Sequence, residues 1–246
     1  MEKAVFKEEL CRVLCENGME ELLAAKREEI TDRFFALTDF LLSENARYNL
    51  TAITEPHDMI LRHYADSAAS ARYLPTGATL LDVGCGAGFP SLPLAILRPD
   101  LTVTALDATA KRVEFVRAAG ERLSLSNLRT VCARAEDYAR GEGREAFSAV
   151  TARAVANLRT LSELCLPCVE VGGLFLAMKA KSAAEELSEA RHAISVLGGK
   201  CEREETLTLT NGAEELSRTA LLIRKLRKTP PEYPRAYARI LKKPLM

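Results

Sequence analysis

A glycine-rich turn between two apolar runs constrains the fold of this chain more than any other feature. Residues 79–83 form a short apolar run containing one acid, Gly84, Gly86 and Gly88 follow at alternate positions, and residues 91–97 are apolar again. Glycine permits a positive φ and lets a ligand approach the bare backbone, and the start of a helix presents N–H groups to such a ligand. The pattern therefore predicts a buried strand, a binding turn and a helix. The alternative is a strand-to-helix turn that binds nothing.

The residue at position 89 distinguishes between two nucleotide cofactors. In a dinucleotide fingerprint, G-x-G-x-x-G/A, the third small residue lets the helix pack closely on the strand. Counted from Gly84, that position is Phe89, whose side chain is too large for this role. The pattern from Asp82 to Gly88, Asp-x-Gly-x-Gly-x-Gly, instead resembles the first motif of class I methyltransferases, which use S-adenosyl-L-methionine.

A second acid follows the next apolar run. Residues 101–107 read as a strand that ends in Asp107, roughly 20 residues beyond the glycines, where an acid can bind both hydroxyls of a ribose. The alternative role for Asp107 is to cap the helix expected over residues 108–123, and the two roles can coexist.

The order of the expected elements indicates an α/β fold. Residues 1–75 are predicted to be helical, because apolar residues recur at helical spacing from Ile30 to Leu41, and a further helix is expected from Pro56 to Tyr73. From residue 79 onward, short strands alternate with helical stretches, which is typical of a parallel sheet covered on both faces. Strands are expected near residues 79–83, 102–106, 128–132, 148–152, 174–179, 204–210 and 217–225, the last two joined by a hairpin turn at Asn211-Gly212.

A mostly parallel sheet with an antiparallel C-terminal hairpin edge is typical of class I (Rossmann-like) methyltransferases, and we expect that fold here, with an N-terminal helical extension. We expect residues 1–75 to form the extension and residues 76–246 to form the Rossmann-like domain, with a basic C-terminal tail over residues 228–246.

Charge is distributed unevenly although the formal net charge is zero. Residues 224–246 hold eight Lys or Arg against one acid, so this end carries +7 and the remainder −7. Such asymmetry indicates contact with a polyanion. Tyr233 and Tyr237 are interleaved with the arginines and are candidates for stacking on RNA bases. A solvated basic terminus is the alternative.

Cysteine usage and the lack of a long apolar run predict a cytoplasmic protein. The seven cysteines have no disulfide-framework spacing, and no apolar run approaches the ~20 residues of a membrane span. Cys165 and Cys168 have C-x-x-C spacing but lie inside an apolar helical run, so we interpret them as small buried residues. The three histidines, His57, His63 and His192, have no metal-ligand spacing, and no metal is expected.

Seven segments, in order along the chain, resemble the motifs of the bacterial RsmG family, also called GidB. They are residues 48–54 (YNLTAIT), 62–67 (RHYADS), 84–93 (GCGAGFPSLP), 111–115 (KRVEF), 152–156 (ARAVA), 176–179 (LAMK) and 229–235 (TPPEYPR). The chain departs from the usual pattern by small-for-small changes at Cys85, Ser91, Thr151-Ala152 and Ala180. Because these changes lie near the backbone, they weaken the resemblance little.

The resemblance implies an enzyme that methylates N7 of one guanine in the decoding-region loop of 16S ribosomal RNA, using S-adenosyl-L-methionine. Residues 151–153 (TAR) stand where enzymes that methylate exocyclic amines usually carry an Asn/Asp-Pro-Pro-aromatic clamp. The cysteine nucleophile of pyrimidine C5 chemistry is also missing, since the only Pro-Cys pair, Pro167-Cys168, lies away from the expected methyl donor. Guanine N7 has an in-plane lone pair and no proton, so no catalytic base is required. Catalysis then depends on alignment, which can contribute ~7–11 kcal/mol.

The resemblance also implies roles for individual residues. Asp107 would bind the ribose, Ala135 and Glu136 the adenine, and Arg153 a phosphate or the cofactor carboxylate in the crevice outside the strand ends. Arg153 and His63 are the positioning candidates. The implied cofactor-binding residues are Asp82, Gly84, Gly86, Gly88, Phe89, Asp107, Ala135, Glu136 and Arg153. The implied RNA-binding candidates are Arg62, His63, Lys179 and Arg235.

Three other functions compete with this one. A small-molecule methyltransferase would not need the basic tail. A ribosome-assembly factor that binds RNA without chemistry would not need the glycine motif or Asp107, and a dinucleotide-dependent dehydrogenase is disfavoured by Phe89. The partner expected is 16S ribosomal RNA, the small ribosomal subunit or an assembly intermediate. We expect no membrane partner, and we expect the chain to act as a monomer.

Overall fold

The computed structural model describes residues 1–153, 156–179 and 183–245. Ala154, Val155 and Ala180, which belong to the motifs considered above, lie outside the described residues, as does Met246 at the end of the predicted tail.

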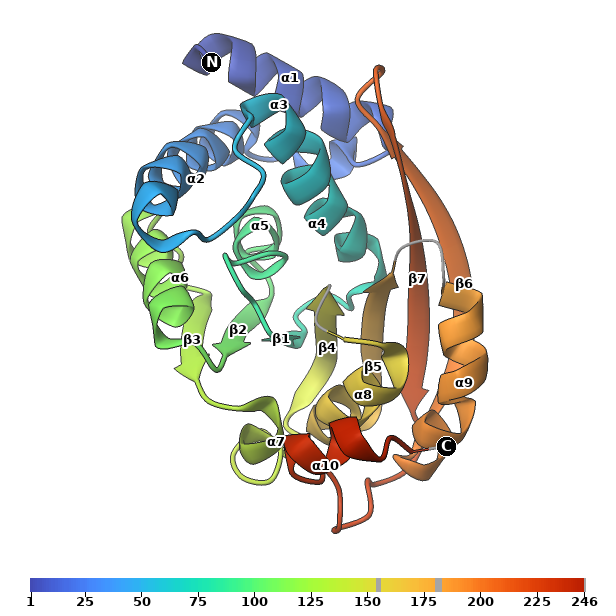
Figure 1. Cartoon of the computed structure of the whole chain (residues 1–246). Coiled ribbons are helices and arrows are strands. Elements are labelled where there is room, and N and C mark those ends of the chain that lie inside the picture. The colour runs from blue at the N-terminus through green and yellow to red at the C-terminus, as the bar shows by residue number, and fades with distance from the viewer. Residues whose placement is uncertain (154–155, 180–182, 246) are drawn as a thin grey trace.

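Seven strands form one twisted sheet at the centre of the molecule (Figure 1). Their spatial order is β3-β2-β1-β4-β5-β7-β6. Neighbouring pairs are parallel except those that include β7, which is antiparallel to both β5 and β6. The strands are β1 (Thr79–Val83), β2 (Thr102–Asp107), β3 (Leu128–Cys132), β4 (Phe147–Arg153), β5 (Val169–Lys179), β6 (Gly199–Thr210) and β7 (Glu215–Lys225).

Helices cover both faces of the sheet (Figure 1). On one side lie α1 (Lys3–Glu16), α2 (Arg27–Tyr48), α3 (Pro56–Met59), α4 (Asp66–Ala68), α5 (Ser91–Leu97) and α6 (Ala110–Arg122). On the other lie α7 (Ala135–Tyr138), α8 (Leu158–Cys165), α9 (Ala183–Val196) and α10 (Tyr237–Lys242). Short 3₁₀ turns span Glu20–Leu22, Ala69–Tyr73 and Leu166–Cys168, and a π-helical turn spans Ile60–Ala65.

Successive residues of the central strand β1 enter different hydrophobic cores. Leu80 belongs to the core under the N-terminal helices, whereas Leu81 belongs to the core under α8 and α9. Side chains of a strand alternate between the two faces of its sheet, so both faces are buried here, as in other parallel sheets. The N-terminal helices share their core with the sheet, because Phe6 and Phe34 join the same cluster as Leu174.

The fold class expected from the sequence is confirmed, with two strands that begin earlier than expected and one helix that includes a different type of turn. β5 begins at Val169 rather than near residue 174, and β6 begins at Gly199 rather than near residue 204. The helix expected from Pro56 to Tyr73 is helical throughout but includes the π-helical turn. Such turns add one residue to the helical repeat and are frequent at functional sites.

The hairpin predicted at Asn211-Gly212 reaches back to the first helix (Figure 1). Gly212 has φ +86°, a conformation that side chains disfavour. Arg12 donates to the Asn211 carbonyl at 3.0 Å, and the Asn17 side-chain amide bonds both backbone groups of Thr210. The N-terminal segment is therefore held in two ways: by its shared core with the sheet and by these hydrogen bonds to the hairpin.

Cys165 and Cys168 are fully buried and unpaired, as the sequence indicates. Burial raises the pKa of the Cys165 thiol well above its usual value and that of Cys168 to about 12, so both thiols are protonated at neutral pH. Among the described residues, no helix combines the length and apolar character needed to cross a bilayer.

Candidate functional site

A cavity of ≈ 450 Å³ opens beyond the carboxyl ends of β1, β2 and β4. This is where open α/β sheets bind ligands, at the point where the strand order reverses on either side of β1. Of the predicted cofactor-binding residues, Gly84, Gly86, Phe89, Asp107, Ala135, Glu136 and Arg153 line this one cavity, together with His63. Asp82 and Gly88 do not line it.

The glycine turn shapes the floor of the cavity. The N–H groups of Gly84 and Cys85 both donate to the Leu106 carbonyl, at 2.8 and 2.9 Å, which ties the turn to the end of β2. Gly86 has φ +57°, and a Cβ there would meet no atom closer than 4.0 Å, so its bare backbone faces open space. A ligand can therefore approach this residue directly.

Gly88 has a packing role in the structure. A Cβ at this position would lie 2.4 Å from a Leu92 methyl carbon, and the residue has φ +85°. The absence of a side chain thus permits close contact between the turn and α5.

Asp82 lies behind the cavity wall and is fully buried. Its Oδ2 accepts hydrogen bonds from the Ser91 hydroxyl and from the Ser91 N–H, the latter at 3.2 Å. Burial raises the pKa of Asp82 to about 6, against the opposing effect of the Ser91 hydrogen bonds. The carboxylate therefore holds the first turn of α5 against the glycine turn.

Asp107 is the last residue of β2, lines the cavity and is only 6% exposed. Its Oδ1 accepts from the Thr109 N–H at 2.8 Å and its Oδ2 from the Gly86 N–H at 3.1 Å. Arg112 lies 3.5 Å from Oδ2. Each carboxylate oxygen has two lone pairs, so Oδ1 can accept a further hydrogen bond, and Oδ2 can do so when a hydroxyl replaces the long contact to Arg112.

One end of the cavity is formed by the start of α7 and by three residues that the sequence analysis did not assign to it. Ala135 and Glu136 lie there with Arg134, Leu164 of α8 and Tyr237 of α10. Tyr237 comes from the basic tail, about 100 residues further along the chain than α7. In the sequence, the only signal for Tyr237 is its position among the arginines of the basic tail.

The opposite end contains an aromatic and cationic cluster. The His63 ring stacks on Phe89 with centroids 4.2 Å apart and planes 12° apart. The Arg153 guanidinium lies 5.4 Å from the centre of the same Phe89 ring. Thr51, which also lines the cavity, places its hydroxyl 2.9 Å from His63 Nε2. This end offers flat faces and polar edges, which suit an aromatic heterocycle.

Asp66 fixes Arg153 from behind. Its Oδ2 accepts from Arg153 Nη1 at 2.8 Å, and its Oδ1 accepts from Arg218 Nε of β7 at 2.8 Å. Asp66 is buried, and Arg153 also donates to the Arg62 carbonyl at 3.1 Å. The network joins the π-helical turn, β4 and β7, so the guanidinium at the cavity has a fixed orientation.

His63 remains uncharged in the folded protein. Burial, assisted by the nearby Arg153 guanidinium, lowers the pKa of His63 to about 3, against 6.5 for an exposed histidine. The unfolded chain therefore binds one more proton than the folded chain between these two pH values.

We expect the His63→Gln variant to show this linkage. Since the extra proton favours the unfolded state at low pH, the free energy of unfolding of the parent chain should fall relative to that of His63→Gln by roughly 3 kcal/mol between pH 7 and pH 4. Urea unfolding at several pH values measures the difference. His192→Gln, at an exposed position on α9, serves as the control. Parallel pH profiles for His63→Gln and the parent would contradict the expectation.

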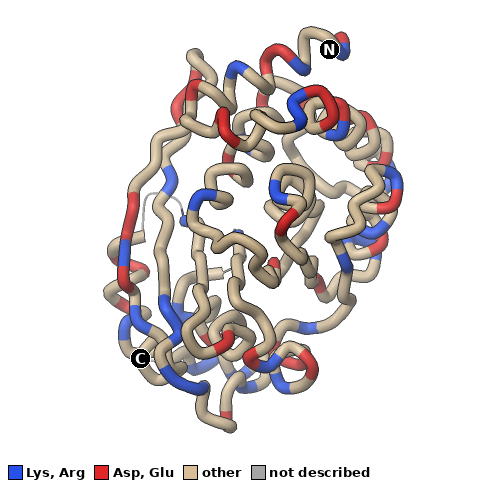
Figure 2. The backbone as a smooth tube through the Cα atoms, turned by 180° about the vertical axis from the view of Figure 1, so that it is seen from behind, with Lys and Arg blue, Asp and Glu red and all other residues tan. Residues whose placement is uncertain are grey.

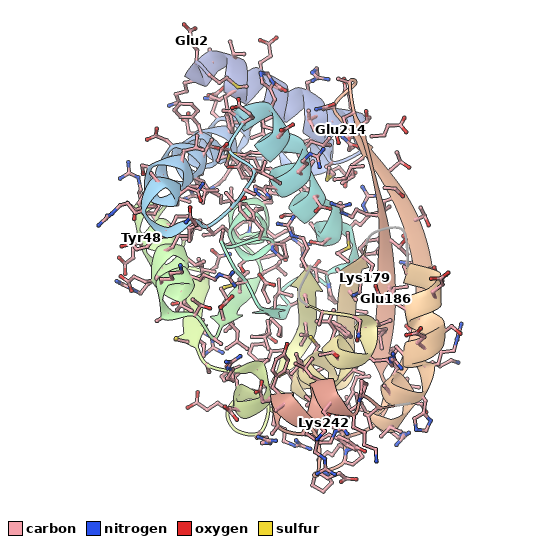
Figure 3. The ribbon with its side chains drawn as sticks, viewed as in Figure 1. Glu2, Tyr48, Lys179, Glu186, Glu214 and Lys242 are labelled. Carbon is pink, nitrogen blue, oxygen red and sulfur yellow. The ribbon has the colours of Figure 1, made fainter. Side chains whose placement is uncertain are left out.

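Two of the RNA-binding candidates, Lys179 and Arg235, are mostly buried and paired with carboxylates of the protein. Lys179 Nζ lies 2.8 Å from Glu186 Oε2, and the two side chains lie together between β5 and α9 (Figure 3). Arg235 is paired with buried Glu163, at 2.6 Å. Arg62 is paired with Glu214 on the hairpin but stays more exposed. The sequence showed the charges of these residues but not their partners, which are distant along the chain.

Other cations surround the cavity mouth. Arg112 and Arg134 line it and are exposed, and neither was identified from the sequence. Figure 2 shows further Lys and Arg gathered near the C-terminal end of the chain. The opening therefore has exposed positive charge next to a polar cavity, as a binding site for a polyanion requires.

A family model and many curated proteins match this sequence. The model described as GidB, rRNA small subunit methyltransferase G, matches residues 30–215. The protein named ribosomal RNA small subunit methyltransferase G of Geobacillus kaustophilus is 46% identical over 217 residues, covering 87% of this chain and 89% of its own length. The protein of the same name from Staphylococcus saprophyticus is 42% identical over 239 residues, covering 96% and 97%.

Solved structures share the fold at low identity. TYW2 of M. jannaschii, solved in complex with AdoMet, has a TM-score of 0.52 at 14% identity, covering 65% of this chain and 75% of its own. NSun6 of Pyrococcus horikoshii, solved with SFG, has a TM-score of 0.54 at 13% identity, covering 66% and 52%. These matches support the class I methyltransferase fold.

Proposed function

The chain belongs to the GidB family, rRNA small subunit methyltransferase G, and from this we propose that it methylates N7 of a specific guanine in the decoding-region loop of 16S ribosomal RNA. The methyl donor is S-adenosyl-L-methionine. The observation that carries the proposal is that one cavity is lined by Asp107, by Glu136 and by the cluster of His63, Phe89 and Arg153.

The cavity residues fit the methyl donor. We propose that Asp107 binds the ribose hydroxyls, that Ala135 and Glu136 lie at the adenine, and that the backbone at Gly84 and Gly86 supports the methionine end. A buried carboxylate whose Oδ1 has one lone pair free, and an open backbone at Gly86, support these roles. When bound, the cofactor supplies an electrophilic methyl group on a sulfonium centre.

The cluster at the other end is proposed to hold the target guanine. N7 carries no proton, so the chain has no proton to remove and needs only to orient the base and exclude water. Methylation makes the purine cationic, so an unbalanced positive charge nearby would oppose the reaction. His63 is neutral, and Asp66, which Arg153 shares with Arg218, offsets part of their positive charge. Neutral His63 therefore adds no charge that would oppose the cationic product.

The N-terminal segment is proposed to complete the target side of the site. Leu50, Thr51 and His63 all come from residues 1–75, whereas the cofactor side comes from residues 76–246. Asn45 holds the intervening loop through hydrogen bonds of 2.9 and 3.0 Å to the backbone of Thr51. Both sides are supplied by one chain, which supports action as a monomer. The cations proposed to meet the RNA backbone are the exposed Arg112 and Arg134 and the half-exposed Arg62, which is paired with Glu214.

The test uses ribosomal particles from a strain that lacks this protein. With S-adenosyl-L-methionine carrying a labelled methyl group, we expect label in 16S ribosomal RNA, presented as naked RNA, as the 30S subunit or as an assembly intermediate. Comparison of the three substrates identifies the natural one. Label only in small molecules would favour a small-molecule methyltransferase. Binding of RNA with neither cofactor binding nor methyl transfer would favour an assembly factor.

A further inference from the structure

The chain after β7 folds back onto the methyltransferase domain and ends in α10, beside α7 and α8 (Figure 1). Its main anchor is Arg235. The Arg235 guanidinium donates through Nε to Glu163 Oε1 at 2.7 Å and through Nη2 to Oε2 at 2.6 Å, and the Arg235 N–H donates to Oε1 at 2.9 Å. Glu163 lies in α8 and is 1% exposed. A two-pronged pair of this kind fixes direction as well as distance.

Two further arginines hold the backbone of the same segment. Arg140 donates to the Pro234 carbonyl at 3.0 Å, and Arg144 donates to the carbonyls of Tyr233 and Thr229, each at 2.8 Å. Both arginines come from the chain that follows α7. The segment is therefore anchored on the same part of the fold that forms one end of the cofactor cavity.

This path brings Tyr237 into the cavity. The side chain lines it with Arg134, Glu136 and Leu164, and the Arg134 guanidinium lies 6.0 Å from the centre of the Tyr237 ring. Tyr237 is half-buried, so part of its ring remains open to a ligand. A partly open aromatic ring in a polar cavity can stack against the face of a flat heterocycle.

We infer that Tyr237 is an aromatic wall for the adenine ring of S-adenosyl-L-methionine, and that the Glu163–Arg235 pair is the positioning device that holds it there. The inference rests on the proposed function, because it takes the cofactor from it. It changes the interpretation of the basic tail: the charge of Arg235 serves the cofactor site, while the exposed Arg239, Lys242 and Lys243 remain available to RNA.

The test for Tyr237 is calorimetric titration of the full chain with S-adenosyl-L-methionine and with 5′-methylthioadenosine, which lacks the amino-acid part. Tyr237→Ala should weaken both ligands by about ten-fold, the effect of removing one base-stacking aromatic. Tyr237→Phe keeps the ring and should stay within about three-fold of the parent. Arg239→Ala, on the exposed face of the same helix, should bind as the parent does.

Three outcomes separate the possible failures. A parent chain that binds neither ligand would overturn the proposed function. If the parent binds the ligands and Tyr237→Ala binds them equally well, only the role of Tyr237 beside the adenine ring is overturned. A weaker Tyr237→Ala whose melting temperature without ligand also falls by more than a few degrees would indicate a structural role, and would overturn the inference unless Tyr237→Phe restores affinity.

The positioning role of the ion pair is tested by a double-mutant cycle. Glu163→Gln loses the charge that orients Arg235 but keeps an acceptor, so it should weaken cofactor binding several-fold in the parent. In the Tyr237→Ala background the same change should have little further effect, because the residue it positions is gone. Fully additive effects would overturn the positioning role.

Discussion

Replacing Asp107 by alanine is expected to weaken S-adenosyl-L-methionine binding by at least ten-fold while the fold persists. A carboxylate that accepts from two ribose hydroxyls makes charge-assisted hydrogen bonds of roughly 1.5–3 kcal/mol each. Each 1.4 kcal/mol corresponds to about ten-fold in affinity. Calorimetric titration with the cofactor, with a melting curve of the free protein, measures both quantities.

Two variants control this experiment. Asp107→Asn keeps an acceptor for the Thr109 N–H, which Asp107 Oδ1 binds at 2.8 Å, and should fall between the parent and Asp107→Ala. Asp137→Ala removes an exposed acid of α7 near the same cavity and should leave the affinity unchanged. If Asp107→Ala bound the cofactor as tightly as the parent, the residue would have no part in the site.

Replacing Arg153 by alanine is expected to reduce methyl transfer by about 100-fold with a much smaller effect on cofactor binding. The guanidinium packs over Phe89 and holds the His63 end of the cavity, and small displacements of a reacting group can cost this much. Single-turnover rates with saturating cofactor and RNA isolate the effect on transfer.

Arg218→Ala is the matched control, because Arg218 binds the same carboxylate, Asp66, from β7 but does not line the cavity. Both changes leave Asp66 with one partner fewer, and each should lower the free energy of unfolding by up to about 3 kcal/mol. Only Arg153→Ala should then lose most of its transfer rate at a temperature where both variants are folded. Equal losses of rate in the two variants would mean that the network acts only through stability.

The parallel half of the fold could be predicted because its signals are local. The run over residues 79–83, the glycines after it and Asp107 each follow from neighbouring residues, and the structure brings Gly84, Gly86 and Asp107 to one cavity. The start of β5 at Val169 was missed, because Gly172 and Gly173 interrupt its apolar pattern. Val169 of β5 pairs with Phe147 of β4, and this pairing extends β5 beyond the length that its composition favours.

The parts that could not be predicted depend on partners distant in the sequence. Asp82 pairs locally with Ser91, yet its burial behind the cavity wall is decided by the whole sheet. Lys179 and Arg235 show only a charge in the sequence, and their carboxylate partners are identified by the three-dimensional path of the chain. Removal of the tail after Lys228 would take away Tyr237, which lines the cavity, together with the basic residues. A truncated chain would therefore change the cofactor site as well as RNA binding.

Mapping the methyl group on the RNA tests the central claim most directly. After reaction of the protein with S-adenosyl-L-methionine and small subunits from a strain that lacks it, the modified base is located by chemical cleavage at 7-methylguanosine and by mass spectrometry of nuclease fragments. We predict one 7-methylguanosine, in the decoding-region loop of 16S ribosomal RNA. A methyl group on another atom or on another RNA, or an RNA left unmodified by a protein that binds the cofactor, would contradict it.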